Sequence, residues 1–295
     1  MAETTGIEWC DATFNPWIGC TKVSPGCDGC YAERSTPSRT MQIVWGAGQQ
    51  RHRTSEGNWA MPLRWNREAA EFEREHGRRR RVFCASLADV FDNEVPTTWR
   101  MDLFSLIADT PNLDWLILTK RIGNVMRMCS GDSLMFDMIC NRVWLGATVV
   151  NQEEADRDIP KLDRTPAAVR WLSMEPLLGP VDIGWERLWG TGGSNGIDWV
   201  VAGGESGPEA RPMHPGWVRS LRDQCGYAGV PFLFKQWGEW LPAGKEPNEV
   251  QRLTLQFARP TARCYSWADG ETLVHAGKKA AGRSLDGALH DGYPT

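Results

Sequence analysis

Short apolar runs recur through most of this chain, and segments with a helical pattern separate them. The runs are rich in Val, Ile, Leu, Phe and Trp, and they cover residues 13–18, 81–86, 115–119, 143–149, 170–174, 199–202 and 231–234. Short runs that are apolar throughout are typical of parallel strands buried on both faces. Strands that alternate with helices form βαβ units around a parallel sheet. The chain is therefore predicted to be an α/β protein.

Helices are predicted between the runs, at residues 66–76, 97–108, 152–162 and 214–224. Gly77 is a suitable residue to end the first of them, and Pro160 is expected to shorten the third, because proline lacks a backbone N–H. Six or seven βαβ units fit a partial (β/α) TIM-type barrel better than a Rossmann sheet, since no G-x-G-x-x-G follows a strand and opens a helix. Residues 1–240 are assigned to this barrel, and residues 241–295 to an irregular C-terminal extension packed on it.

The composition indicates a globular protein and bears on where in the cell it is expected. With 295 residues, 41% of them hydrophobic and 24% charged, the chain has enough material for a buried core. No stretch approaches the roughly 20 apolar residues of a membrane span, and the N-terminus does not resemble a targeting peptide. A cytoplasmic location without membrane contact is therefore expected.

The formal net charge of −4 means that any nucleic-acid contact must come from a local basic patch. One candidate is the run of four arginines formed by Arg78, Arg79, Arg80 and Arg81. The alternative is that this run is a solvated surface, because the helix dipole favours basic residues after a helix end.

A loop that follows the first run contains Cys20, Cys27 and Cys30 within the sequence GCTKVSPGCDGCY. The chain has nine cysteines, and an odd number without a secretion signal indicates reduced thiols and one metal site. Three thiolates from one loop can hold a metal centre and leave one coordination position without a protein ligand.

Two kinds of metal centre are compatible with this loop. A structural zinc site needs four ligands, and Cys27-x-x-Cys30 supplies only one close pair, so Cys10 or His52 would have to complete the site. A [4Fe–4S] cluster held by three thiolates instead keeps one iron free of protein ligands. We expect the cluster, because the glycines of the loop allow the chain to wrap around it.

Polar residues or glycines follow every predicted strand, where parallel α/β barrels bind their ligands. After the cysteine loop come Ser86 and Asp89, Lys120 and Arg121, Thr148 and Asn151, Glu175, the turn Gly203, Gly204, Glu205 and Ser206, and finally Lys235 and Gln236. The glycine turn is the clearest of these, because paired glycines let a ligand approach free backbone N–H groups. The alternative for this turn is a tight connection between a strand and a helix.

Several stretches resemble the radical S-adenosylmethionine superfamily, and most of all its phage-associated branch known as the three-Cys-motif proteins. They are IEWCDATFNPWIGCTKVSPGCDGCYAE, LTKR, VWLGATV, SMEPLLGP, VVAGGESG, PFLFKQWGEW and GKKAAGRSLDG. The resemblance implies that Cys20, Cys27 and Cys30 ligate a [4Fe–4S] cluster whose open iron binds S-adenosylmethionine. It also implies that an electron from an external donor cleaves this cofactor to a 5′-deoxyadenosyl radical, which abstracts hydrogen from the substrate.

This chain departs from the usual pattern of the superfamily in its cysteine spacing, which is C-x6-C-x2-C in place of C-x3-C-x2-C. Gly29 precedes the last cysteine, where an aromatic residue is usual, and Tyr31 follows it. Candidate cofactor-binding residues are Tyr31, Lys120, Glu175 and the turn of Gly203, Gly204, Glu205 and Ser206. The expected substrate is a nucleic acid or nucleotide.

Two other functions remain open from the sequence. One is a nucleic-acid-binding protein stabilised by zinc or by a cluster, and the other is an iron–sulfur protein for electron transfer or redox sensing that does not cleave the cofactor. Cys84, at the second run, is either a hydrogen-atom donor or a small buried side chain, and the second is expected. The sequence predicts no particular catalytic residue.

Overall fold

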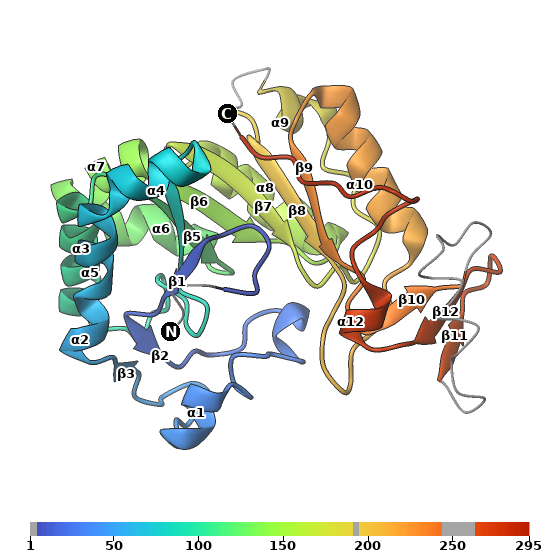
Figure 1. The fold of residues 1–295 in the computed structure, drawn as a ribbon, viewed down its shortest axis with the longest axis horizontal. Coiled ribbons are helices and arrows are strands. Elements are labelled where there is room, and N and C mark those ends of the chain that lie inside the picture. Colours follow the sequence, from blue (N-terminus) through green and yellow to red (C-terminus); the bar gives the residue numbers. More distant parts are fainter. Residues whose placement is uncertain (1–4, 191–194, 244–262, 295) are drawn as a thin grey trace. The chain divides into compact units, whose positions relative to one another are not determined.

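The computed structural model describes residues 5–190, 195–243 and 263–294. The chain forms two compact units (Figure 1). Unit 1 holds residues 1–24, 30–147 and 161–170, and unit 2 holds residues 25–29, 148–160 and 171–295. Parallel strands follow one another in the order β1-β4-β5-β6-β7-β8-β9. The predicted α/β class, with a partial (β/α) barrel, is therefore confirmed.

Four strands of the parallel sheet lie in unit 1, apart from the last residue of β6, and most of their residues are buried. They are β1 (Ala12–Phe14), β4 (Arg80–Cys84), β5 (Leu113–Thr119) and β6 (Val143–Thr148). In the register of the sheet, Phe14 lies opposite Cys84, and Cys84 lies opposite Ile117. Cys84 is completely buried in this sheet, in agreement with the expectation of a small buried side chain.

The first apolar run is not one strand, as predicted, but two. After β1, Pro16 interrupts the ladder because it has no N–H to donate. The chain then forms β2 (Trp17–Ile18), which pairs antiparallel with β3 (His52–Arg53) in a separate small sheet. The cysteine loop therefore follows this second short strand.

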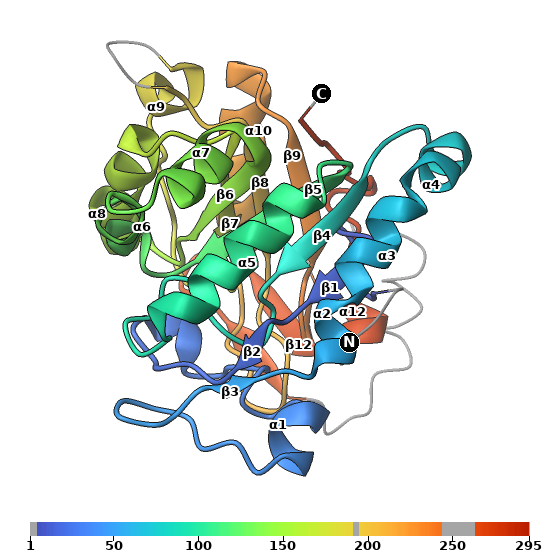
Figure 2. The ribbon, with the colours of Figure 1, turned by 90° about the vertical axis from the view of Figure 1, so that its left-hand side faces the viewer.

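Helices of unit 1 occupy the segments between its strands. They are α1 (Thr36–Thr40), α2 (Glu56–Trp59), α3 (Met61–Arg67), α4 (Ala69–His76), α5 (Thr97–Asp109), α6 (Ile122–Cys129) and α7 (Ser133–Arg142). The predicted helix at 66–76 is broken at Glu68, whereas Gly77 ends α4 in the left-handed conformation, at φ 67°, as expected. Helix α5 packs against both α3 and α7 (Figure 2).

The prediction that Pro160 shortens its helix is wrong, because α8 runs over Gln152–Arg164 with the proline inside it. Proline removes one helical hydrogen bond and destabilises the helix. Burial of apolar side chains offsets this loss, since Ile159 and Leu162, on either side of Pro160, are both fully buried. Tertiary packing therefore stabilises α8 enough for the helix to continue beyond Pro160.

The strands of unit 2 are β7 (Val169–Met174), β8 (Trp199–Gly203) and β9 (Phe232–Gln236). A 3-10 turn η1 (Pro25–Cys27), a short helix α9 (Trp185–Trp189) and a long helix α10 (Pro215–Ala228) accompany them. Helix α10 contacts β8, β9 and α9 (Figure 1). It continues past its predicted end at residue 224 and stops at Gly229, which has a φ of 70°.

The predicted irregular extension contains regular structure in its described part. Strands β10 (Trp240–Pro242), β11 (Cys264–Ser266) and β12 (Thr272–His275) form an antiparallel sheet in the order β10-β12-β11, and α12 (Lys278–Ala281) follows. The last segment runs along β9, where the Phe234 N–H donates to the His290 carbonyl at 2.9 Å and the Gly292 N–H to the Phe232 carbonyl at 3.0 Å. Residues 244–262 of the extension lie outside the described residues, and the predicted domain boundary at residue 240 stays a prediction.

None of the helices that the structure describes combines the length and the apolar character that spanning a membrane requires.

Candidate functional site

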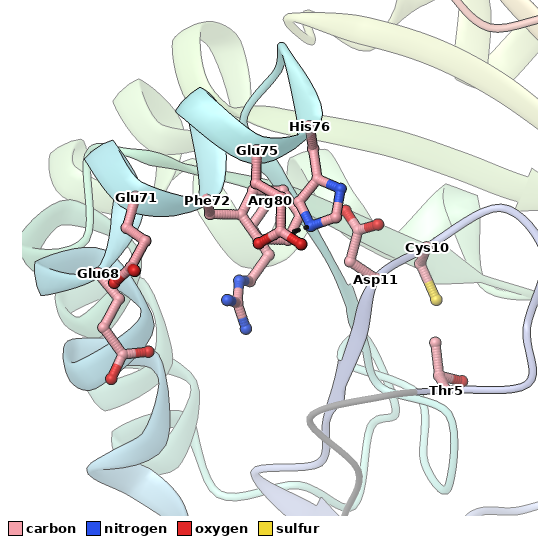
Figure 3. A pocket seen from close by; sticks show the side chains of 9 residues that line it. All are labelled: Thr5, Cys10, Asp11, Glu68, Glu71, Phe72, Glu75, His76 and Arg80. Carbon is pink, nitrogen blue, oxygen red and sulfur yellow. Dashed lines mark ion pairs between the residues drawn. The ribbon is translucent and has the colours of Figure 1, made fainter.

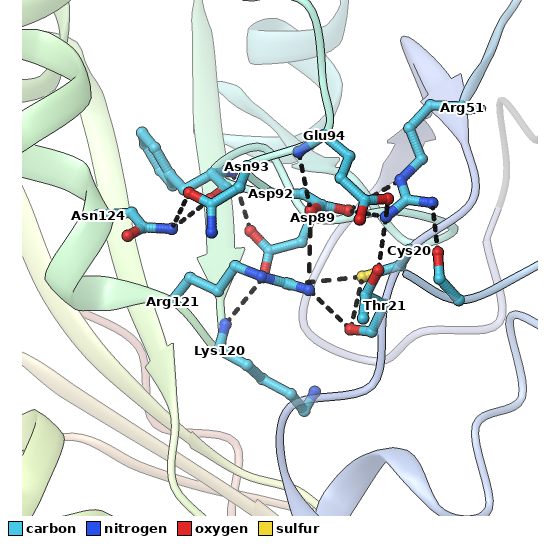
Figure 4. Close-up of polar contacts among 12 residues, drawn as sticks. Cys20, Thr21, Arg51, Asp89, Asp92, Asn93, Glu94, Lys120, Arg121 and Asn124 are labelled. Carbon is cyan, nitrogen blue, oxygen red and sulfur yellow. Dashed lines mark hydrogen bonds and ion pairs between the residues drawn. The ribbon is translucent and has the colours of Figure 1, made fainter. Parts of the chain in front are cut away.

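In unit 1, the first part of the cysteine loop meets the ends of β4 and β5. The Gly19 N–H donates to the Leu87 carbonyl at 3.1 Å, so the chain before Cys20 lies beside the chain that follows β4. The Arg121 guanidinium, just after β5, donates from Nη1 to Cys20 Sγ at 3.4 Å (Figure 4). The same Nη1 donates to Asp89 Oδ2 at 3.0 Å. The structure therefore joins three residues that the sequence placed after three different strands.

A second arginine, Arg51, holds the residue after Cys20. Its side chain is completely buried, and its Nη2 lies 2.7 Å from Asp92 Oδ2 and 2.7 Å from Glu94 Oε2. The same nitrogen donates to Thr21 Oγ1 at 2.7 Å (Figure 4). Sequence reasoning missed Arg51, because it lies in a long segment without periodicity, and only its charged partners after β4 reveal its role.

The surroundings of Cys20 favour the protonated thiol in the protein without bound metal. Burial, together with the Asp89 carboxylate, raises the pKa of Cys20 to about 12, although the Arg121 guanidinium opposes both effects. Burial alone would lower the pKa of the Arg121 guanidinium, but the attraction of Asp89 and Cys20 outweighs it and this pKa is raised. A metal that binds Cys20 as thiolate must therefore displace a proton.

Lys120, a predicted cofactor ligand, joins this network only with its backbone, whose N–H donates to Asp89 Oδ2 at 3.1 Å. Its side chain extends away from the carboxylate (Figure 4). Tyr31, another candidate, donates its hydroxyl to the Ser86 carbonyl at 2.8 Å and is 57% exposed. Both side chains are thus placed next to the end of β4 or β5, with the phenol ring of Tyr31 open to solvent.

Unit 2 contains the middle of the cysteine loop, residues 25–29, and a clamp that holds it. Arg211 donates to the two carboxylate oxygens of Glu205, at 2.8 Å from Nε and 2.6 Å from Nη2. Its guanidinium also donates to the Pro25 carbonyl at 2.9 Å and to Asp28 Oδ2 at 3.3 Å. The hydrogen bonds to Glu205 raise the pKa of Arg211. Sequence reasoning missed Arg211, which lies in an irregular segment before α10.

The clamp also accounts for a glycine of the loop. A Cβ atom on Gly29 would lie 2.7 Å from Glu205 Oε1, so the residue before Cys30 has no room for a side chain. Glu205 is only 7% exposed, and its carboxylate is engaged by Arg211. The predicted cofactor-facing acid therefore contacts the cysteine loop itself.

The two glycines of the Gly203-Gly204 turn are required by packing within unit 2. The Gly204 N–H donates to the Gln236 carbonyl at 2.9 Å, and a Cβ atom there would collide with the Trp237 carbonyl. A Cβ atom on Gly203 would lie 2.9 Å from Glu175 Oε1. The N–H of Gly204 is thus used by the protein, but the alternative of a tight connection between a strand and a helix is wrong, because β8 ends at Gly203 and α10 begins only at Pro215.

The other predicted residues of unit 2 meet at the ends of β7 and β9. Lys235 Nζ lies 3.0 Å from Glu175 Oε1, with side chains that are 19% and 12% exposed. Ser173 donates to Glu175 Oε2 at 3.2 Å, and the Gln236 amide donates to Ser206 Oγ at 2.8 Å. Glu175, Lys235 and Ser173 thus form one polar group, and Gln236 and Ser206 form another.

The arginine run contacts the protein itself. Arg78 forms two hydrogen bonds with the Asp11 carboxylate, at 2.6 and 2.8 Å. Burial raises the pKa of Asp11, but its bonds with Arg78 and Arg81 prevail and the pKa is lowered. Arg79 pairs with Asp114 at 3.4 Å, Arg80 lies over the Phe72 ring at 4.5 Å and Arg81 over the Trp144 ring at 5.6 Å. The alternative of a solvated run does not hold for Arg81, which is only 8% exposed, and the nucleic-acid patch stays a prediction.

A cavity of about 440 Å³ in unit 1 lies away from the strand ends described above. It is lined by Thr5, Cys10, Asp11, Glu68, Glu71, Phe72, Glu75, His76 and Arg80 (Figure 3). Residues 10 and 11 precede β1 and Arg80 begins β4, so this cavity is at the amino ends of the strands. In barrels of this type the carboxyl ends carry the chemistry, and we therefore place the candidate site there.

The donor set of the cysteine loop fits an iron–sulfur cluster in its chemistry. All nine cysteines are free thiols, and thiolates are the ligands that such clusters take. Within the described ranges, no group of three or more His, Cys, Asp or Glu side chains surrounds a position for one metal ion. This applies to Cys20, Cys27 and Cys30 as well as to a zinc site completed by Cys10 or His52, so both kinds of metal centre stay predictions.

Comparisons with known proteins give one family and two solved structures. The profile of the family described as "Protein of unknown function (DUF5131)" matches residues 4–294. No curated protein sequence matches the chain. A spore photoproduct lyase mutant with bound AdoMet and dinucleoside spore photoproduct is 10% identical, with a TM-score of 0.41 and coverage of 89% of this chain and 67% of that one. A second spore photoproduct lyase mutant is also 10% identical, with a TM-score of 0.40 and coverage of 93% and 72%.

Proposed function

The chain belongs to the family described as "Protein of unknown function (DUF5131)", and we propose that this member is a radical S-adenosylmethionine-type enzyme. In this proposal Cys20, Cys27 and Cys30 hold a [4Fe–4S] cluster, and the iron without a protein ligand binds S-adenosylmethionine. The observation that carries the proposal is a loop with three free thiols that begins, at Gly19, beside the segment after β4. There the sulfur of Cys20 accepts a hydrogen bond from Arg121.

When bound, the cluster and S-adenosylmethionine would supply the electron and the radical that begin the reaction. The chain's own residues hold the loop. In unit 1, Arg121 donates to the Thr21 carbonyl at 2.6 Å and Arg51 donates to the Thr21 hydroxyl. In unit 2, Arg211 holds the Pro25 carbonyl. Each contact restricts the backbone next to a proposed thiolate ligand, and such restriction reduces the entropy lost when the cluster binds.

The proposed cofactor-binding residues differ in the contacts that their side chains make within the protein. Lys120 and Tyr31 lie at the strand ends, where the Tyr31 hydroxyl donates to the Ser86 carbonyl. The Glu175 carboxylate pairs with Lys235 and accepts a hydrogen bond from Ser173. In the turn of Gly203, Gly204, Glu205 and Ser206, the acid is occupied by Arg211. We therefore assign Glu205 the role of positioning the loop and propose direct cofactor contact for Tyr31, Lys120 and Glu175.

The test begins with protein purified without oxygen. The wild type is expected to be brown and to contain about four iron and four sulfide per chain. Cys27→Ala should lose most of both, because two thiolates cannot hold the cluster firmly. Cys140→Ala is the matched control, since it removes a thiol on α7 outside the loop and should keep the iron content of the wild type.

Addition of dithionite and S-adenosylmethionine to the iron-loaded wild type should release 5′-deoxyadenosine, measured by mass spectrometry. A colourless protein with one zinc would contradict the cluster. Full iron content with intact S-adenosylmethionine would instead favour an iron–sulfur protein for electron transfer or redox sensing.

The proposed substrate is a nucleic acid or nucleotide, and the proposed electron donor is external. The resemblance of the sequence and the run of arginines support this choice of substrate. Binding of single- and double-stranded DNA and RNA oligonucleotides, measured by fluorescence anisotropy, should weaken steeply between low and high salt. Absence of binding at low salt would contradict a polynucleotide and leave a mononucleotide substrate to be tested by the same cofactor-cleavage assay.

A further inference from the structure

Arg121 connects a proposed cluster ligand to a carboxylate in a nearly dry part of unit 1. Its side chain is 8% exposed, and that of Asp89 is 7% exposed. The guanidinium uses Nη1 for both Cys20 Sγ and Asp89, and it uses Nη2 for the Thr21 carbonyl (Figure 4). A plain structural ion pair between Arg121 and Asp89 would not require the contacts with the cysteine loop.

The position of this guanidinium is set by a rigid support. Asp89 accepts hydrogen bonds from the Thr119 hydroxyl at 2.8 Å, the Lys120 N–H at 3.1 Å and the Phe91 N–H at 2.9 Å. The Arg121 N–H donates to the Thr119 hydroxyl at 2.8 Å. Thr119 and Lys120, at the end of β5, thus fix the Asp89 carboxylate, and the Thr119 hydroxyl also fixes the backbone of Arg121. This support keeps the Arg121 guanidinium beside the Cys20 sulfur.

A cation that donates to a cluster-bound sulfur acts on the reduction of the cluster. Reduction adds one negative charge to the cluster and its thiolates, and a hydrogen bond to a sulfur stabilises that charge. Burial strengthens this effect, because little water screens the charges. Around Cys20 the carboxylates of Asp89 and Asp92 act in the opposite direction. Arg121 pairs with Asp89 at 3.0 Å and lies 3.9 Å from Asp92, whose nearest cation is Arg51 at 2.7 Å.

We infer that Arg121 is a positioning residue that sets the reduction potential of the cluster through its hydrogen bond to Cys20. The inference rests on the proposed function, since it requires the cluster. Arg121 raises the potential, so that the external donor can deliver its electron, and Asp89 limits this increase by sharing the guanidinium.

The experiment measures the midpoint potential of the cluster by EPR-monitored redox titration of anaerobically purified protein without S-adenosylmethionine. Arg121→Met should lower the equilibrium constant for reduction about tenfold, which corresponds to about 59 mV for one electron. Arg121→Lys keeps the charge and should lie between this variant and the wild type. Arg127→Met is the matched control on α6, because Arg127 donates to Asn93 and Asn124 rather than to sulfur. Its potential should equal that of the wild type.

Asp89→Asn provides a second measurement if Arg121→Met does not keep its iron. It removes the carboxylate that competes for the guanidinium, so the potential should rise. Equal potentials for the wild type, Arg121→Met and Asp89→Asn, each with full iron content, would overturn the inference and leave the proposed function intact. A wild type without iron would overturn both.

Discussion

Substitution of the buried Arg51 is the strictest test of how the cysteine loop is held. Arg51 has no exposed side-chain surface, and it donates to carboxylates, a hydroxyl and two backbone carbonyls in unit 1. Arg51→Met has a similar length and fills much of the same space. The substitution therefore removes the charge and the hydrogen bonds without opening a large cavity.

The magnitude follows from what the substitution leaves behind. Asp92 is only 3% exposed and would lose its nearest cation, while Glu94, at 31%, would be solvated. Removal of one partner of a buried ion pair costs about 3–5 kcal/mol. Arg121 remains 3.9 Å from Asp92 and compensates in part, so we expect the lower end of that range, about 3 kcal/mol.

The assay is urea unfolding followed by tryptophan fluorescence and, for local stability, hydrogen exchange of the amides near Thr21. Arg74→Met is the matched control, because the Arg74–Glu71 pair is 75% exposed on both sides. Exposed pairs contribute little, so this control should change the stability by less than about 0.5 kcal/mol.

A double variant then tests the cause. Because Asp92→Asn removes the charge that Arg51→Met leaves unpaired, the double variant should be more stable than the sum of the single losses by at least about 1 kcal/mol. A loss below about 1 kcal/mol for Arg51→Met would refute the reasoning, as would additive effects of the two substitutions.

Three further outcomes follow from other contacts. Gly204→Ala should abolish soluble expression or lower the urea midpoint strongly, because its Cβ would collide with the Trp237 carbonyl, and a variant of wild-type stability would contradict that packing. Gly226→Ala should instead stabilise α10 by about 0.5–1 kcal/mol, since nothing lies within 4 Å of the new Cβ; a measurable loss in the same assay would argue against this space. Hydrogen bonds from Arg219 lower the pKa of Asp286 below its unfolded value, so the pair stabilises the protein above about pH 4 and loses this effect as the pH falls through the folded pKa. Asp286→Asn should therefore be slightly less stable at pH 7, by under about 1 kcal/mol for so exposed a pair, and equal to the wild type near about pH 2, and a constant difference across pH would count against the pair.

The periodicity of the sequence was sufficient for the fold class and for most strands, because these depend on which faces of short segments are apolar. It was not sufficient for boundaries that depend on packing. Pro160 lies inside α8 because Ile159 and Leu162 are buried around it. The first run divides at Pro16, and no local pattern in the sequence predicts that Trp17 pairs with Arg53 of β3.

The same distinction applies to the candidate site, of which the sequence determined one part and the tertiary structure another. By itself the sequence determined that three thiols follow the first apolar run and that polar residues follow the other runs, since the apolar or polar character of each segment is a local property. Only the tertiary structure decided which charges meet. Cys20 and Arg121 are 101 residues apart, and Asp28 and Arg211 are 183 apart. The choice of partner across such separations depends on burial and on packing, which bring Arg51 and Arg121 to the first part of the cysteine loop and Arg211 to its middle.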